Sequence, residues 1–153
     1  MNEHCYISDL TLNEKTLLKS EKYTVERLRA MTDIMDHNQF ELHDATGPYR
    51  LEVSIEEFKC RLCITDSQDK EHLKYISLNP LRRVIKDYHI VCESYVSSVQ
   101  HADPSKVEAI DMGRRSLHNE AAEILEDLLV PHVTMDFETS RKLFTLIYVL
   151  QLR

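Results

Sequence analysis

Two short clusters of basic residues could bind an anion in this otherwise acidic chain. Arg82, Arg83 and Lys86 form the first cluster, and Arg114 and Arg115 form the second. A guanidinium group presents a planar set of N–H donors that meets phosphate or carboxylate oxygens in pairs. A helix N-terminus at the first cluster would add free backbone N–H groups. The clusters therefore predict a site for a phosphate-bearing ligand, and the alternative is a solvated helix face with internal ion pairs.

His89 and Glu93 continue the line of Arg82 and Lys86 at helical spacing, on the face opposite the apolar residues. A second polar line follows farther along the chain. It consists of Asp111, Arg114, Arg115, His118, Asn119 and Glu120. This line could bind a carboxylate or a phosphate through its arginines and Asn119, or it could form structural salt bridges. It could also orient His118 through Asp111 or Glu120, as a general acid or base requires.

Gly113 lies inside the helix that this second line predicts. A glycine in a helix interior costs about 1 kcal/mol relative to alanine. We therefore expect a reason for it, which could be the close approach of another helix, a break in the helix, or room for a ligand.

The cysteines and glycines argue against the common metal and cofactor motifs. Cys60 and Cys63 form a C-x-x-C pair, but residues three apart in a strand point to opposite faces, which predicts one buried and one exposed thiol and no metal site. His118 has Ala122 where a zinc-binding helix needs a second histidine. With 2 glycines in the chain, neither a P-loop, a dinucleotide turn nor a nucleophile elbow can form. We expect no cofactor.

Composition and charge limit the compartment and the partners. With 42% hydrophobic and 29% charged residues, the chain is typical of one globular domain over residues 1–153. The net charge of −7 opposes general nucleic-acid binding. There is no secretory signal, and the apolar run over residues 143–152 is shorter than the roughly 20 residues that cross a bilayer. We therefore expect a cytoplasmic protein with reduced cysteines and no membrane contact.

The elements that position these side chains follow from hydrophobic periodicity. Alternating apolar residues predict a hairpin over residues 49–64, with Leu51, Val53, Leu62 and Ile64 on its buried face. Neighbouring strands are expected near residues 7–12, 40–43 and 73–78, the last with a bulge. Helical spacing predicts helices over about residues 23–37, 80–100 and 104–129 and after residue 136. Asn79, Asp103 and Asp136 should cap the last three.

The predicted fold class is α+β, with a small antiparallel sheet packed against the two long helices and an apolar C-terminal helix. Because the long helices are joined by a short connection, they should run antiparallel. Arg82 or Arg83 should then approach Arg114 or Arg115 and form one electropositive patch. The C-terminal helix is apolar almost all round, so it should lie in the core or in a subunit interface.

Several strings in the sequence resemble an alphaproteobacterial family known as uncharacterised protein family 0262. They are Leu81-Arg-Arg-Val-Ile-Lys-Asp-Tyr, Cys92-Glu-Ser-Tyr, Ile110-Asp-Met-Gly-Arg-Arg, Leu117-His-Asn-Glu, Gly47-Pro-Tyr-Arg-Leu and Arg141-Lys-Leu-Phe-Thr-Leu-Ile. The resemblance implies a small single-domain protein without an assigned activity. It also implies an aromatic residue where this chain has His89, and small residues, glycine among them, where it has Ala121-Ala122.

Three hypotheses of function follow from these residues. The first is a binding or regulatory module that recognises a phosphate-bearing ligand through the arginines, Lys86 and Asn119. The second is a small enzyme in which His118 acts as general acid or base, although no nucleophile accompanies it. The third is a protein-interaction subunit or homodimer, which would use the apolar C-terminal segment or a sheet edge.

Overall fold

The predicted hairpin forms the centre of a four-stranded sheet. The computed structural model describes residues 2–13, 23–101 and 103–152. The strand order is β1-β3-β4-β5, and a separate antiparallel pair is formed by β2 and β6. The strands are β1 (Ile7–Leu12), β2 (Phe40–Leu42), β3 (Tyr49–Glu56), β4 (Lys59–Thr65), β5 (Glu71–Ser77) and β6 (Val133–Met135). The helices are α2 (Thr24–Asp36), the 3₁₀ turn η2 (Asn79–Leu81), α3 (Arg82–Gln100), α4 (Pro104–Leu129) and α5 (Phe137–Gln151).

The alternation in β3 and β4 determines which face of the sheet is buried. Leu51, Val53, Leu62 and Ile64 are all buried, as the sequence predicts. The bulge expected in the third strand is wrong, because β5 pairs with β4 in continuous register. The apparent shift in alternation has another origin. Leu73 and Tyr75 lie on the outer face and are exposed despite their apolar character.

The sheet is mixed rather than wholly antiparallel. β1 pairs parallel to β3, while β3, β4 and β5 pair antiparallel. The buried side chain of Asn38, just after α2, holds this edge strand. Its Oδ1 accepts the N–H of Ile7 at 2.7 Å, and its Nδ2 donates to the carbonyl oxygens of Ile7 and Ile34. A bifunctional amide therefore ties β1 to the end of α2.

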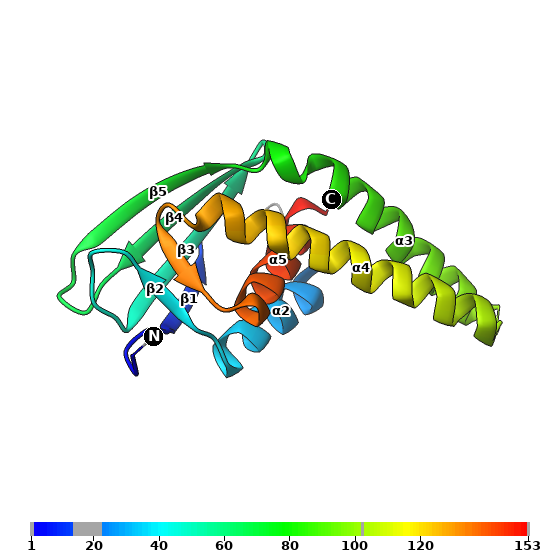
Figure 1. Ribbon diagram of the computed structural model, residues 1–153, viewed down its shortest axis with the longest axis horizontal. Coiled ribbons are helices and arrows are strands. Elements are labelled where there is room, and N and C mark those ends of the chain that lie inside the picture. Colours follow the sequence, from blue (N-terminus) through cyan, green and yellow to red (C-terminus); the bar gives the residue numbers. More distant parts are fainter. Residues whose placement is uncertain (1, 14–22, 102, 153) are drawn as a thin grey trace.

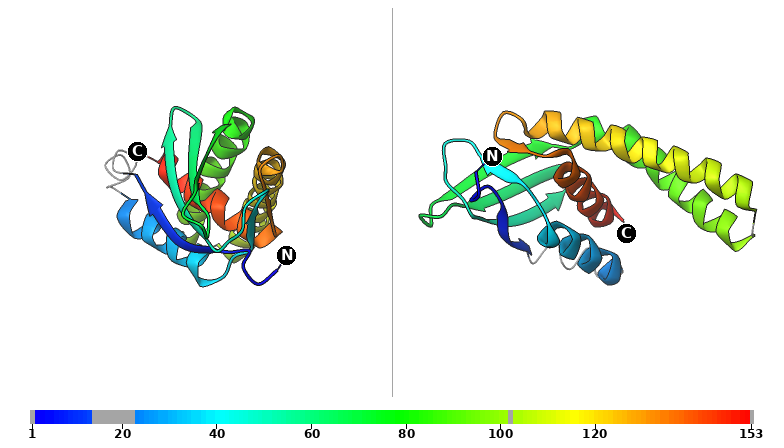
Figure 2. Two further views of the ribbon diagram at one scale, coloured as in Figure 1. Left: turned by 90° about the vertical axis from the view of Figure 1, so that its left-hand side faces the viewer. Right: turned by 60° about the horizontal axis from the view of Figure 1, so that its bottom comes forward.

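The predicted α+β fold class is confirmed, with the helices packed on one face of the sheet. Helix α5 lies against the inner face of the sheet together with the C-terminal end of α4, where Leu125 and Leu129 line the same small cavity as Leu51 and Leu62. Helix α2 packs on α5, and α3 packs along α4. Figures 1 and 2 show α3 and α4 as an antiparallel pair that projects beyond the sheet. Of the two long helices, α4 supplies residues that line the core beneath the sheet, whereas α3 packs along α4 and meets α5 through Tyr88.

Two of the three predicted helix caps are present. Asp103 accepts the N–H of Lys106 at 3.3 Å, and Asp136 accepts the N–H of Thr139 at 3.0 Å. Asn79 does not cap α3, because the chain enters this helix through the 3₁₀ turn η2. Its Oδ1 instead accepts from the Arg82 Nε at 3.0 Å.

The apolar C-terminal helix belongs to the core of the chain. In α5, Leu143, Phe144, Leu146, Ile147 and Leu150 are all buried. This leaves few apolar residues of the helix for a subunit interface. Over the ranges that the structure describes, no helix is long and apolar enough to cross a membrane.

Gly113 has no visible steric reason in this chain. Helix α4 continues through it without a break, and a Cβ atom at this position would have no neighbour within 4 Å. We therefore predict that Gly113→Ala increases the free energy of unfolding by about 1 kcal/mol. Urea denaturation tests this, with Ala109→Gly on the same helix as the control that should lose a similar amount. A decrease for Gly113→Ala would instead mean that another molecule packs closely at this site.

Candidate functional site

A groove of about 690 Å³ lies beside the first half of α3. We call it the α3 groove. Residues from the β3–β4 turn, from α3 and from the end of α5 line it, together with Tyr23 just before α2. They are Tyr23, Glu57, Phe58, Arg82, Ile85, Lys86, His89, Glu93, Tyr148, Gln151 and Leu152. The α3 face that helical spacing predicts, with Arg82, Lys86, His89 and Glu93, therefore opens into one groove.

The β3–β4 turn positions the Arg82 guanidinium. The Arg82 Cζ lies 4.1 Å from the centroid of the Phe58 ring, which is a cation–π geometry. Glu57 and Phe58 have φ angles of 50° and 59°, and such left-handed backbone costs a non-glycine residue roughly 1 to 2 kcal/mol. The left-handed backbone of this turn is thus conformationally unfavourable, and the turn places the Phe58 ring against Arg82.

His89 connects two other polar side chains of the groove. Its Nε2 lies 3.1 Å from Glu93 Oε1, and its Nδ1 lies 2.7 Å from the Tyr148 hydroxyl on α5. Burial raises the pKa of Tyr148 above its ordinary value, so this phenol stays protonated at neutral pH. The groove therefore combines two cations and two acids with an imidazole and a neutral hydroxyl.

The other predicted arginines are held by acids elsewhere. Arg83 contacts Asp87 at 3.1 Å and Glu120 at 2.5 Å. Arg114 and Arg115 both contact Asp111, at 2.6 and 3.0 Å. The structure thus places Arg82 and Lys86 at the α3 groove and the other three arginines outside it, each with a carboxylate partner.

Arg82 and Arg83 have different surroundings because neighbouring side chains on a helix point in different directions. Adjacent residues point about 100° apart, so Arg82 faces the groove while Arg83 faces α4. Arg83 reaches α4 at Glu120, about 9 Å along the helix axis from Arg114. Asn119, the remaining residue of the predicted anion site, is exposed on α4 and is not among the groove residues.

His118 is a core residue and not an acid-oriented imidazole. Its side chain packs against the rings of Tyr88 and Phe144, and Nε2 lies 2.8 Å from Thr145 Oγ1. Burial, assisted by nearby arginines, lowers the pKa of His118 to about 4. Asp111 and Glu120, which could have oriented it, are instead engaged by arginines. His118 is therefore neutral near pH 7.

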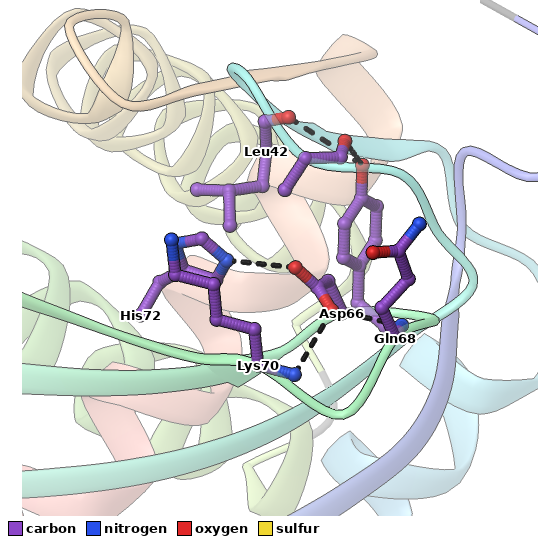
Figure 3. Close-up of polar contacts among 7 residues, drawn as sticks. Leu42, Asp66, Gln68, Lys70 and His72 are labelled. Carbon is purple, nitrogen blue, oxygen red and sulfur yellow. Dashed lines mark hydrogen bonds and ion pairs between the residues drawn. The ribbon is translucent and has the colours of Figure 1, made fainter.

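A second acid–histidine pair lies at the far end of the sheet and stabilises a turn (Figure 3). Asp66 Oδ1 accepts the backbone N–H groups of Gln68 and Lys70, while Oδ2 lies 2.9 Å from His72 Nε2. The hydrogen bond with His72 is the main cause of the lowered pKa of Asp66. Both carboxylate oxygens are thus used to fix the β4–β5 connection.

The thiols of the C-x-x-C pair diverge as predicted. Cys60 is buried, and Cys63 is half-buried on the other face of β4. Within the described residues, no three or more His, Cys, Asp or Glu side chains gather in a way that could hold a metal ion.

Comparison with known proteins identifies the family. Residues 4–153 match the family described as "Uncharacterised protein family (UPF0262)". The chain belongs to the UPF0262 family. A UPF0262 protein of Rhodospirillum rubrum is 41% identical over 150 residues, which cover 97% of this chain and 93% of that protein. No solved structure matches the chain.

Other UPF0262 relatives come from further alphaproteobacteria. A UPF0262 protein of Rhizobium johnstonii is 40% identical, covering 96% of this chain and 95% of its own length. One of Brucella anthropi is 42% identical, covering 95% and 92%. The family has no assigned function, so the α3 groove of this UPF0262 protein must be interpreted from its own residues.

Several residues of the groove escaped the sequence analysis, among them Phe58, Tyr148 and Gln151. In the sequence pattern, Phe58 is an ordinary inward-facing strand residue. Tyr148 and Gln151 fall within the apolar C-terminal helix. Only the tertiary packing brings them beside Arg82 and His89.

Proposed function

We propose that this protein is a binding module for phosphate-bearing ligands and that the α3 groove is its site. One observation carries the proposal. Within the described residues, Arg82 and Lys86 have no acidic partner, whereas Arg83, Arg114 and Arg115 each contact a carboxylate. Cations that line a groove without an ion-pair partner can bind an anion without first breaking a salt bridge.

Two acids also line the groove and must be weighed against these cations. Glu93 lies at the His89 imidazole, and Glu57 is exposed at the turn, where solvent screens its charge. The attraction comes from the two cations, which have no acidic partner within the described residues. The site should bind a dianion such as phosphate better than a monoanion, because Coulomb attraction scales with the ligand charge. Its affinity should fall as salt concentration rises.

The other two hypotheses have less support. Catalysis by His118 would require access and an orienting acid, but this imidazole is buried against aromatic rings. A homodimer through the C-terminal helix would require apolar residues that α5 already uses in the core.

Titration with inorganic phosphate tests the proposed function. We predict saturable binding that Arg82→Gln weakens by about tenfold or more, since one charge-assisted hydrogen bond contributes about 1.5 to 3 kcal/mol. Arg115→Gln is the matched control, because this arginine is also exposed but lies outside the groove. Both affinities can be measured by isothermal titration calorimetry. Equal losses in the two variants, or no saturable binding by the native chain, would contradict the proposal.

A further inference from the structure

The His89 imidazole is bonded on both sides within the α3 groove. Glu93 contacts Nε2 at 3.1 Å, and the Tyr148 hydroxyl contacts Nδ1 at 2.7 Å. The side chain of His89 is 43% exposed, so it can exchange protons with solvent. Imidazole is also the side chain that most readily changes charge near neutral pH.

The two contacts determine where the protons lie in each charge state. The Glu93 carboxylate only accepts hydrogen bonds, so the single proton of a neutral His89 belongs on Nε2. Nδ1 then accepts the O–H of Tyr148. In the imidazolium both ring nitrogens donate, so the Tyr148 oxygen becomes the acceptor at Nδ1. The Tyr148 O–H then no longer donates to His89 and can donate to another group.

We propose that binding of a phosphate group in the α3 groove is coupled to uptake of one proton by His89, which releases the Tyr148 hydroxyl to donate to the ligand. The inference rests on the proposed function and adds two residues to the site. The bound group would meet donors from two helices, with Arg82 and Lys86 on α3 and Tyr148 on α5. A phosphate monoester fits these donors because its terminal oxygens only accept hydrogen bonds when it is a dianion.

The charges around His89 explain why the ligand would control its protonation. On α3, Arg82 and Lys86 oppose the imidazolium and Glu93 favours it. Glu57 on the β3–β4 turn also favours it, while the Tyr148 phenol and the Gln151 amide on α5 carry no charge, and Tyr23 before α2 also lines the groove. Burial raises the pKa of the Cys92 thiol, which lies on α3 beside the Tyr148 hydroxyl. A bound dianion offsets the two cations and so favours proton uptake. By linkage, a protonated His89 must strengthen anion binding by the same factor.

The competing interpretation is that the His89–Tyr148 contact only fastens α5 to α3. In that case the hydroxyl keeps one orientation, and anion affinity does not depend on the charge of His89. The resemblance implies an aromatic residue at this position, so the proposal concerns this chain and is not extended to its relatives.

Sulfate titrations test the coupling, because sulfate remains a tetrahedral dianion throughout the range in which histidine titrates. We expect the native chain to bind sulfate about tenfold more tightly near pH 5.5 than near pH 8. Calorimetry near pH 6.5 in two buffers of different ionisation enthalpy should show uptake of up to one proton on binding. His89→Gln should still bind sulfate, but with no proton uptake and with little dependence on pH.

Tyr148→Phe should lower the affinity near pH 5.5 towards the value near pH 8, while thermal melting confirms that the variant folds. If sulfate binds with equal affinity at both pH values, or if His89→Gln still takes up a proton, the coupling is overturned and the anion site stands. If sulfate and phosphate bind at neither pH, the proposed function fails as well.

Discussion

Replacement of Phe144 by alanine should lower the free energy of unfolding by about 3 to 5 kcal/mol. Phe144 is completely buried in α5, and its ring meets Tyr88 of α3 and His118 of α4. Removal of this ring leaves a cavity where three helices join, and rigid aromatic neighbours cannot easily close it. Urea denaturation monitored by circular dichroism at neutral pH measures the loss.

Phe137→Ala provides the matched control. Phe137 begins the same helix but is only half-buried, so its loss should be clearly smaller. If Phe144→Ala lost no more than Phe137→Ala, the central position of α5 in the core would be contradicted.

Acidification should destabilise the native chain through His118 by about 3 kcal/mol in total. Burial lowers the pKa of this imidazole from 6.5 to about 4 in the folded state. Between these two pH values the unfolded chain binds a proton that the folded chain does not. The stabilising contribution is therefore complete above pH 6.5 and is lost as the pH falls towards 4. The gap between the two pKa values gives the roughly 3 kcal/mol.

A variant separates His118 from the other titrating groups. His118→Gln keeps a donor for Thr145 but cannot take up a proton. Urea denaturation near pH 7.5 and near pH 4.5 should show a loss about 2 to 3 kcal/mol larger for the native chain than for His118→Gln. Equal losses for the two proteins would mean that folding does not lower the pKa of His118.

These two predictions concern a different part of the molecule from the α3 groove. Phe144 and His118 lie in the aromatic cluster between α3, α4 and α5, whereas Arg82 and His89 are on the groove side of α3. Tyr148 links the two regions, since its ring packs on Tyr88 and its hydroxyl contacts His89. Substitutions in the core should therefore change stability first, and those at Arg82 should change anion binding with little effect on folding.

The buried face of the hairpin, two helix caps and the polar face of α3 could be predicted from the sequence, because each depends on residues close together in the chain. Alternation in the hairpin predicts its buried face, and Asp103 and Asp136 cap their helices through backbone N–H groups three residues away. Helical spacing also placed Arg82 and Lys86 on one face of α3. The same reasoning failed at Asn79, where a 3₁₀ turn replaces the extended backbone of a capped start.

The sequence by itself thus determined the elements, the buried face of the hairpin and the polar face of α3. The tertiary structure alone decided which charges remain available, because Arg83 meets Glu120 only once α3 packs on α4. It also decided the parallel pairing of β1 with β3 and the contact of His89 with Tyr148, which is 59 residues away. Such contacts depend on how apolar faces pack over the whole chain, and no periodicity within one segment encodes them.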